Sequence, residues 1–146
     1  MKRRKAREYA LQFIYRIDFL EAWKSLDTGR LTEDLSSFWT ETKEKDEDVR
    51  QFAEEIIGGT ITQLGRIDGL LQDVAERWKL SRMASIDRNI LRLATYEILS
   101  RSEIPAAVII NEALEIAKKY STSESASFIN GILDRIAREN RGQNAV

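Results

Sequence analysis

The sequence predicts an all-α fold of about seven helices, and three observations lead to that prediction. Apolar residues recur at three- and four-residue spacing along most of the chain, which is the pattern of one helical face. No stretch alternates Val, Ile or Thr between turn residues, so β-strands have no support. The single proline, Pro105, and the seven scattered glycines leave long segments without a helix breaker.

Two helices joined by a loop are expected at the start of the chain. The first covers about residues 3–23, because apolar side chains recur there from Ala6 to Leu20. The sequence Asp27-Thr28-Gly29 marks a loop. A short second helix over about residues 32–42 follows, with Leu35, Phe38 and Trp39 on its apolar side.

The next two helices are expected to meet at a glycine-rich break. The charged stretch 41–48 should link to a third helix, because acidic side chains are favourable at the positive end of the helix dipole. The apolar stripe continues past Gly58-Gly59 to Leu64, so this helix is expected to pass through both glycines. A break near residues 65–69 should introduce a fourth helix, whose apolar side ends at Trp78. Gly69 lies within that stripe, where it would allow a close helix contact.

The second half of the chain predicts three helices. A helix over about residues 85–100 has an apolar stripe wide enough for burial on two sides. Pro105 suits the first turn of the next helix, which should end near Lys118-Lys119. The segment 121–124 has the spacing of a capping box, and the last helix follows it with an apolar stripe that begins at Phe128. The 146 residues fit one domain of two small helical-bundle subdomains, about 1–78 and 79–146, split near residues 75–82.

The composition excludes most catalytic and metal chemistry. The chain has no cysteine and no histidine, so disulfides, thiolate nucleophiles, zinc sites and serine-histidine triads are all excluded. It also lacks a glycine-rich phosphate loop and a nucleophile elbow. Acidic pairs such as Glu54-Glu55 are explained as solvated helical faces. No apolar run is long enough to span a bilayer. We therefore expect a cytoplasmic protein that is not an enzyme, needs no cofactor or metal, and has no membrane partner.

The basic charge of the chain is concentrated at its start. Five of the first seven residues are cationic, although the formal net charge of the whole chain is −1. The run does not lead into the apolar stretch that a signal peptide needs, because charged residues interrupt the apolar pattern that follows. Two interpretations stay open: a frayed, solvated terminus, or an arginine-rich segment that pairs with RNA phosphates. The cations are Lys2, Arg3, Arg4, Lys5 and Arg7.

Aromatic residues near this run raise the question of base stacking, which contributes about 1–3 kcal/mol per base. Tyr9 and Phe13 have core spacing and are interpreted as core residues. Tyr15 falls off the main apolar face, and its hydroxyl tolerates a wet edge. Phe128 begins the apolar stripe of its helix, where a core residue and an exposed platform look alike.

Four groups of short motifs occur in order and with fitting gaps along nearly the whole chain. They are Ala6-Arg7-Glu8 with Ala10-Leu11-Gln12 and Tyr15; the run from Ile86 to Ile98; Ile104-Pro105 with Ile110-Asn111-Glu112-Ala113; and Ser125 with the run from Phe128 to Asp134. This combination resembles the NusB family of bacterial transcription antitermination factors. The turn at residues 119–122 lacks the glycine often found in the family, and the basic run is slightly shorter at its front.

The resemblance implies both a fold and a function. The implied fold is all-α, with two helical subdomains. The implied function is binding to the boxA segment of nascent ribosomal RNA transcripts as single-stranded RNA, jointly with the small-subunit ribosomal protein NusE. That complex helps RNA polymerase resist termination. Some relatives form homodimers that cover the RNA face, so a homodimer is a further alternative.

Carried over to this sequence, the resemblance also implies site residues. The arginine-rich segment falls on the five cations at the start of the chain. The RNA-proximal aromatics match Tyr15 and Phe128, and an acidic-serine element matches Glu124 and Ser125. The NusE-facing surface includes the helix around Asp87 and Arg88.

Two rival functions are possible for a chain of this kind. NusB-like domains also occur at the front of certain ribosomal RNA cytosine methyltransferases, but this chain has neither the length nor the cysteine for that enzyme. A purely protein-binding helical adaptor with a basic N-terminal arm is the alternative that the sequence leaves open.

Overall fold

In the computed structural model, residues 2–23, 27–75 and 80–141 are described, and every regular element within them is a helix. This confirms the predicted all-α class. Seven α-helices and one short 3-10 helix lie in this part of the chain: α1 (Lys2–Phe19), α2 (Thr28–Thr42), α3 (Glu47–Thr62), α4 (Leu64–Val74), η2 (Leu80–Arg82), α5 (Ser85–Ser100), α6 (Ala106–Tyr120) and α7 (Ser123–Arg141).

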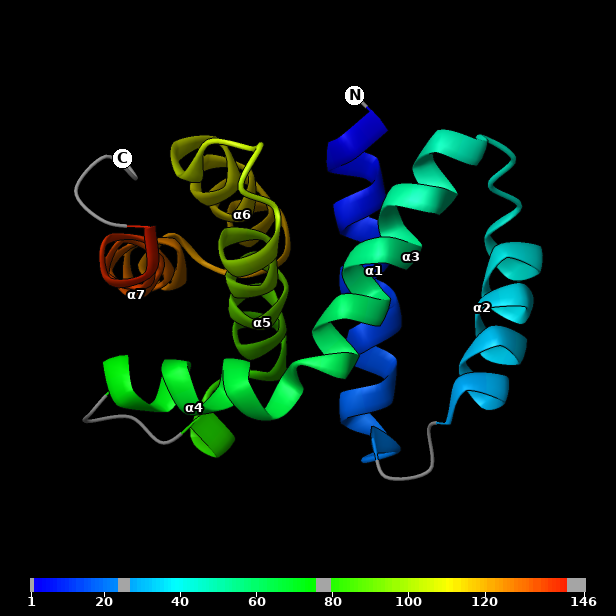
Figure 1. Cartoon of the computed structure of the whole chain (residues 1–146), viewed down its shortest axis with the longest axis horizontal. Helices are drawn as coiled ribbons and strands as arrows, with labels where there is room; N and C mark the ends of the chain where they lie inside the picture. The colour runs from blue at the N-terminus through cyan, green and yellow to red at the C-terminus, as the bar shows by residue number, and fades with distance from the viewer. Residues whose placement is uncertain (1, 24–26, 76–79, 142–146) are drawn as a thin grey trace.

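Helix α5 lies at the centre of the structure. It packs against α1 and α3 on one side and against α4, α6 and α7 on the other (Figure 1). Its buried side chains therefore point in several directions, which confirms the predicted burial on two sides; they are Ile90, Leu91, Leu93, Ala94 and Ile98. These residues belong to one continuous apolar core that reaches every α-helix.

The first two helices differ from the predicted boundaries for identifiable reasons. Helix α1 ends at Phe19 because Glu21 adopts a left-handed conformation with φ of 52°. The N–H groups of Glu21 and Ala22 then donate to the carbonyl oxygens of Asp18 and Ile17, as in a Schellman motif. A glycine usually marks this motif, and none is present here. Helix α2 begins earlier than predicted, because the Asp27 side chain accepts a hydrogen bond from the Arg30 N–H and caps it.

The helix break and the close helix contact near the glycines lie at different residues from those predicted. Helix α3 passes through Gly58-Gly59 as predicted, but the break falls at Gln63 rather than at residues 65–69. A Cβ atom on Gly59 would lie 2.1 Å from the Tyr96 ring, so Gly59 allows the close approach of α3 and α5. A Cβ on Gly69 would meet nothing within 4 Å, so the contact predicted there is wrong. Trp78 lies outside the described residues.

Helix α5 covers Ser85–Ser100 as predicted, whereas the starts of α6 and α7 are each shifted by one residue. Pro105 occupies the N-cap position of α6 rather than its first turn. The hydroxyl of Thr122 accepts a 3.0 Å hydrogen bond from the Ser125 N–H at the start of α7, so Thr122 takes the capping role expected of Ser121.

The predicted division into subdomains falls partly on residues 76–79, which lie outside the described residues. Helix α4 packs against α5 and α7 and turns away from α3 after Gln63 (Figure 1). We therefore propose that α4 groups with the second half of the chain. The boundary between two subdomains would then lie at Gln63.

Alanine substitutions at the two adjacent glycines should separate helix propensity from packing. Gly58→Ala should stabilise the fold by up to about 1 kcal/mol, since Ala favours a helix and no atom lies within 4 Å of the new Cβ. Gly59→Ala should be less stable than Gly58→Ala by about 1–3 kcal/mol, because Tyr96 has to move. Urea unfolding of both variants measures the difference, and equal stabilities would contradict the close contact.

Candidate nucleic-acid interface

The basic segment, defined as Lys2, Arg3, Arg4, Lys5 and Arg7, forms the first turns of α1. It is helical from Lys2 onwards rather than frayed. Cations are unfavourable at the positive end of a helix dipole, and the first turn of α1 contains no acidic residue. The compensating carboxylates come instead from other helices, and they divide the segment into two sides.

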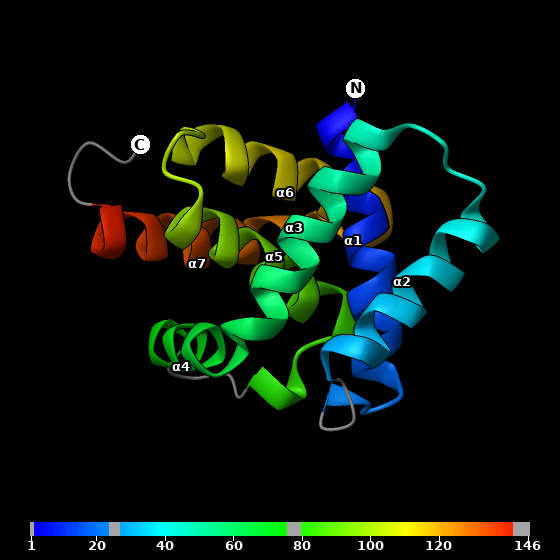
Figure 2. The same cartoon turned by 45° about the vertical axis from the view of Figure 1, so that its right-hand side comes forward.

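On one side, the lysines pair with carboxylates of the loop between α2 and α3 and of the first turn of α3. The start of α3 lies beside the N-terminal end of α1 (Figure 1 and Figure 2). The Lys2 ammonium lies 3.3 Å from Asp46 and 3.0 Å from Asp48, and 61% of the Lys2 side chain is exposed. The Lys5 ammonium lies 2.7 Å from Glu44. Hydrogen bonds from Lys5 and from the Asp46 N–H lower the pKa of Glu44 to about 2. These pairs hold the lysines at the surface, where they stay accessible.

On the other side, Arg4 faces α6 and Arg7 faces α5. Arg4 donates two hydrogen bonds to Glu112, at 3.0 and 2.6 Å, and its side chain is half-exposed. Arg7 donates two hydrogen bonds to Glu97, at 2.9 and 2.7 Å, and both side chains are buried. An RNA phosphate could reach Arg7 only after this buried pair had broken. In this structure the Arg7 guanidinium joins α1 to α5, and its contact with RNA stays a prediction.

Arg3 is the exposed arginine of the segment. Among the described residues, no carboxylate lies within salt-bridge distance of it. Its guanidinium lies 5.1 Å from the centroid of the Phe52 ring, which Arg101 also approaches to 5.2 Å. A cleft of about 370 Å³ opens beside this cluster, between α1 and α3. Arg3 is thus held in place by a ring and keeps its charge available.

The predicted aromatic and polar residues lie further along α1 and at the start of α7. Tyr15 is 36% exposed and stacks on Phe19 with ring centroids 6.2 Å apart. Phe128 is half-buried and packs against the core. Glu124 is exposed. The structure also agrees with the interpretation of Phe13 as a core residue, since that ring is 3% exposed.

Ser125 and Asp87 are brought into direct contact. The Ser125 hydroxyl donates a 2.8 Å hydrogen bond to Oδ2 of Asp87, and so joins α7 to α5. Oδ1 of Asp87 is buried and has no hydrogen-bond partner within the described part of the chain. A residue expected to bind RNA and a residue expected to bind protein therefore form one cluster.

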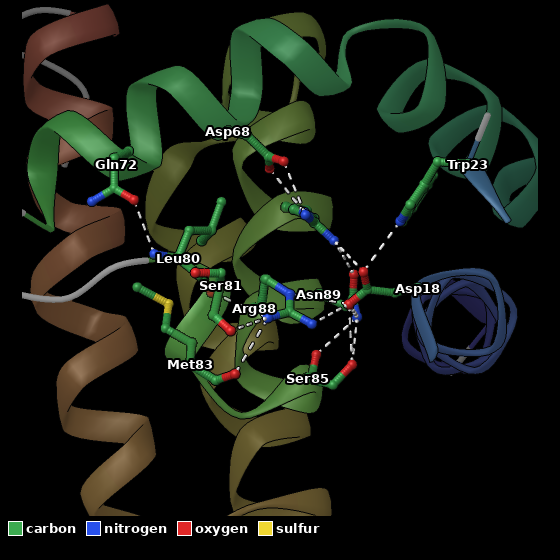
Figure 3. A network of polar contacts seen from close by, with 11 residues as sticks. Asp18, Trp23, Asp68, Gln72, Leu80, Ser81, Met83, Ser85, Arg88 and Asn89 are labelled. Carbon is green, nitrogen blue, oxygen red and sulfur yellow. Dashed lines mark hydrogen bonds and ion pairs between the residues drawn. The ribbon is translucent and has the colours of Figure 1, made fainter. Parts of the chain in front are cut away.

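Arg88, in contrast, belongs to a polar network centred on Asp18 (Figure 3). Its Nε and one terminal nitrogen donate to Asp18 at 3.0 and 2.7 Å. Its other terminal nitrogen donates to the carbonyl oxygens of Leu80, Ser81 and Met83. The Arg88 donors hold α1 and the segment 80–83 against α5, and the role of Arg88 in partner binding stays a prediction.

The Asp18 carboxylate has several further partners. It accepts hydrogen bonds from Trp23, Ser85 and Asn89 and lies 3.2 Å from Arg92, which also pairs with Asp68. Burial raises the pKa of Asp18, but the hydrogen bonds from Arg88, Asn89 and Trp23 and the charge of Arg92 outweigh it and hold the pKa well below 3.8. The network fixes the end of α1 on α5.

Sequence reasoning missed the partners of these groups. Asp18 interrupts an apolar stripe next to Ile17, and that interruption is a local signal of a buried polar contact. Lys119 was assigned only to the helix dipole, although its ammonium lies 2.7 Å from Glu8 on α1. Tyr120, the aromatic residue that follows it, was not considered. In the described ranges, no three His, Cys, Asp or Glu side chains gather to hold a metal ion, and no helix has the length and apolar character needed to cross a membrane.

Removing the Asp18 charge should destabilise the fold in a pH-dependent way. At neutral pH, Asp18→Asn should cost about 3–5 kcal/mol, because two arginines lose a buried partner. A carboxylate with a lowered pKa stabilises the fold above its ordinary value of 3.8 and loses that contribution as the pH falls. The difference from wild type should therefore shrink below about pH 4.

Urea unfolding from pH 7 to pH 3 measures this difference. The matched control is Asp34→Asn, which removes an exposed i,i+4 pair with Arg30 and should cost at most about 1 kcal/mol. A constant difference between Asp18→Asn and wild type across the pH range would contradict the assigned role of the charge.

Comparisons with known proteins agree with this architecture. The family model described as "NusB family" matches residues 4–138. The transcription antitermination protein NusB of Thermodesulfovibrio yellowstonii is 52% identical and covers 95% of this chain and 93% of its own length. A solved structure of T. maritima NusB has 40% identity and a TM-score of 0.81, covering 94% of this chain and 92% of that one.

A more distant solved structure contains the antitermination factors NusB and NusE in complex with dsRNA. It has 22% identity and a TM-score of 0.80, and it covers 94% of this chain and 97% of that one. At this identity the likeness supports the fold alone. The family model and the relatives align with nearly the whole chain, and we conclude that this chain belongs to the NusB family.

Proposed function

We propose that this chain is a transcription antitermination factor that binds boxA-type RNA of nascent ribosomal transcripts together with the ribosomal protein NusE. In this complex it would help RNA polymerase resist termination. Family membership supports the proposal, and one observation carries it: the surface cations of the basic segment and Tyr15 lie on the same helix. Arg4 and Tyr15 are separated by about 16 Å along the axis of α1, so one RNA strand can contact both.

In the proposed interface, different residues bind phosphates and bases. Lys2, Arg3, Arg4 and Lys5 supply attraction to phosphates, which positions the RNA without reading its sequence. Tyr15 and Phe128 offer rings to unpaired bases, while Glu124 and Ser125 offer polar edges. Arg7 holds α1 in position against α5 through its buried pair with Glu97.

RNA binding to this segment is an exchange of partners. Lys2, Arg4 and Lys5 already pair with carboxylates, so a phosphate has to displace or share Asp48, Glu112 or Glu44. The Lys2–Asp48 pair is solvent-exposed, and pairs of this kind contribute about 0–1 kcal/mol, so displacing Asp48 costs little. Glu112 and Glu44 are largely covered, so a phosphate would share Arg4 and Lys5 with them, and the ion pairs keep these cations ordered before RNA arrives.

The proposed protein partner surface centres on Asp87 rather than on Arg88. The distant structural relative was crystallised with NusE, which makes that protein the natural candidate partner. Oδ1 of Asp87 is buried and unpartnered within the described part of the chain, so a donor from the partner would reach it only after the side chains that cover it had moved. Because Ser125 binds the other oxygen of Asp87, RNA and protein would meet at this cluster.

The proposal predicts that the double variant Arg3→Ala, Arg4→Ala binds a boxA-like RNA about tenfold more weakly or worse. Losing two phosphate contacts should also flatten the slope of log affinity against log salt by about 1.4. Fluorescence anisotropy at several salt concentrations measures both quantities. The matched control is Arg30→Ala, Arg138→Ala, which removes the same charge from α2 and α7.

Equal RNA affinity for the double variant and its control would sink the RNA interface and leave the protein-binding adaptor as the better function. Equal affinity for boxA-like and scrambled RNA would contradict sequence-specific binding. Adding NusE should tighten binding of the boxA-like RNA, and no change on addition would contradict joint recognition.

Removing a competing carboxylate should strengthen RNA binding. Asp48→Asn releases Lys2 from one partner and should raise RNA affinity by up to about fivefold. Glu47→Gln is the matched control, because it removes the same charge from the start of α3 but pairs with Arg50 instead. The same anisotropy titration compares them, and an identical gain for both variants would show that only net charge matters.

A further inference from the structure

Glu8, which follows the basic segment in α1, joins α1 to the last turn of α6. Its Oε1 accepts a 2.7 Å hydrogen bond from the Lys119 ammonium and a 2.6 Å hydrogen bond from the Tyr120 hydroxyl. The Lys119 side chain is 60% exposed and that of Glu8 only 17%. Tyr120 is 37% exposed. A partly covered carboxylate therefore holds a cation and an aromatic ring at the surface.

We propose that Lys119 and Tyr120 form a further RNA contact, in which the Lys119 ammonium binds a phosphate and the Tyr120 ring stacks on a base. Glu8 is the positioning residue that orders both. The inference rests on the proposed function, since it extends the same RNA path to residues that the family resemblance had not assigned.

Helix geometry places this cluster between the two ends of the proposed interface. Arg4, Glu8 and Tyr15 are separated by four and seven residues, so they share one face of α1. Glu8 lies about 6 Å from Arg4 and about 10 Å from Tyr15 along the helix axis. An RNA strand that contacts both Arg4 and Tyr15 therefore passes Glu8 and the two residues bound to it.

The cluster of Glu8, Lys119 and Tyr120 is also close in the chain to the start of α7. Tyr120 ends α6, and the turn that follows contains Thr122, the cap of the next helix. Ser125 contacts both Thr122 and Asp87. Lys119 and Tyr120 thus connect the phosphate-binding end of α1 with the polar residues proposed to recognise bases.

The chemistry of both residues fits RNA. A lysine ammonium has three N–H donors, and Glu8 uses one of those on Lys119, so a phosphate oxygen can accept another. The hydroxyl of Tyr120 is fixed by Glu8, and the Lys119 ammonium lies 5.3 Å from its ring centroid. A ring ordered in advance loses little entropy on stacking.

The charge of Glu8 does not oppose a phosphate strongly. Burial raises the pKa of Glu8, but the hydrogen bonds from Lys119 and Tyr120 outweigh it, so the carboxylate stays ionised and paired. The charge of Arg4, in the basic segment, also acts on Glu8, and this local concentration of cations favours a polyanion over an apolar protein surface.

Four single variants test the inference by anisotropy with the boxA-like RNA alone. Tyr120→Leu should weaken binding about fivefold or more, whereas Tyr120→Phe keeps the ring and should lose less. Lys119→Ala should weaken binding and flatten the salt slope by about 0.7. The matched control is Lys118→Ala, which removes the same charge from the adjacent exposed position and should leave affinity and slope unchanged.

If Lys119→Ala and Tyr120→Leu bind RNA like the Lys118→Ala control while the Arg3, Arg4 double variant is weakened, this inference is overturned and the proposed function stands. If wild type fails to bind RNA, both are overturned. A loss that appears only when NusE is present would assign the cluster to the protein partner and would also overturn the inference. Circular dichroism of each variant verifies that the helices remain.

Discussion

The docking of α1 onto α5 through three largely buried ion pairs is the constraint on which the rest of the structure depends. Arg7 pairs with Glu97, and Asp18 pairs with Arg88 and Arg92. Arg7 and Asp18 are eleven residues apart, so they lie on the same face of α1, separated by about 16 Å. Burying ions costs much of what the pairs gain, so their main effect is to fix the orientation of the helix. With this face turned inward, Arg4, Glu8 and Tyr15 are directed to one side of the molecule.

This orientation explains how a chain of net charge −1 can present a basic surface. The cations of the basic segment are not separated from the acidic residues of the chain, because Lys2, Arg4 and Lys5 each contact a carboxylate from another helix. Under the proposed function, attraction to RNA would therefore be local, and it would depend on phosphates displacing or sharing these carboxylate partners. The family is one of transcription antitermination factors rather than of enzymes, in agreement with the absence of histidine and cysteine.

The fold class and most helices could be predicted because helical periodicity is a local property of the sequence. The partners of charged residues could not be predicted in the same way. In the sequence, nothing near Arg7 distinguishes it from the neighbouring cations. Its burial depends on a pair with Glu97, which is ninety residues away. Arg88 likewise depends on Asp18, seventy residues away. The end of α1 could not be predicted either, because the residue that adopts the left-handed conformation there is Glu21 and not the usual glycine.

The path of RNA across the surface is the central claim, and amide chemical-shift mapping tests it most directly. A ¹⁵N-labelled sample titrated with the boxA-like RNA should show its largest shifts in residues 2–15 and 118–128, with little change around Gln72 and Leu80. Such a pattern would place the RNA along the side of α1 that carries Arg4, Glu8 and Tyr15. Shifts confined to α2 and α4, with the start of α1 unchanged, would contradict the account.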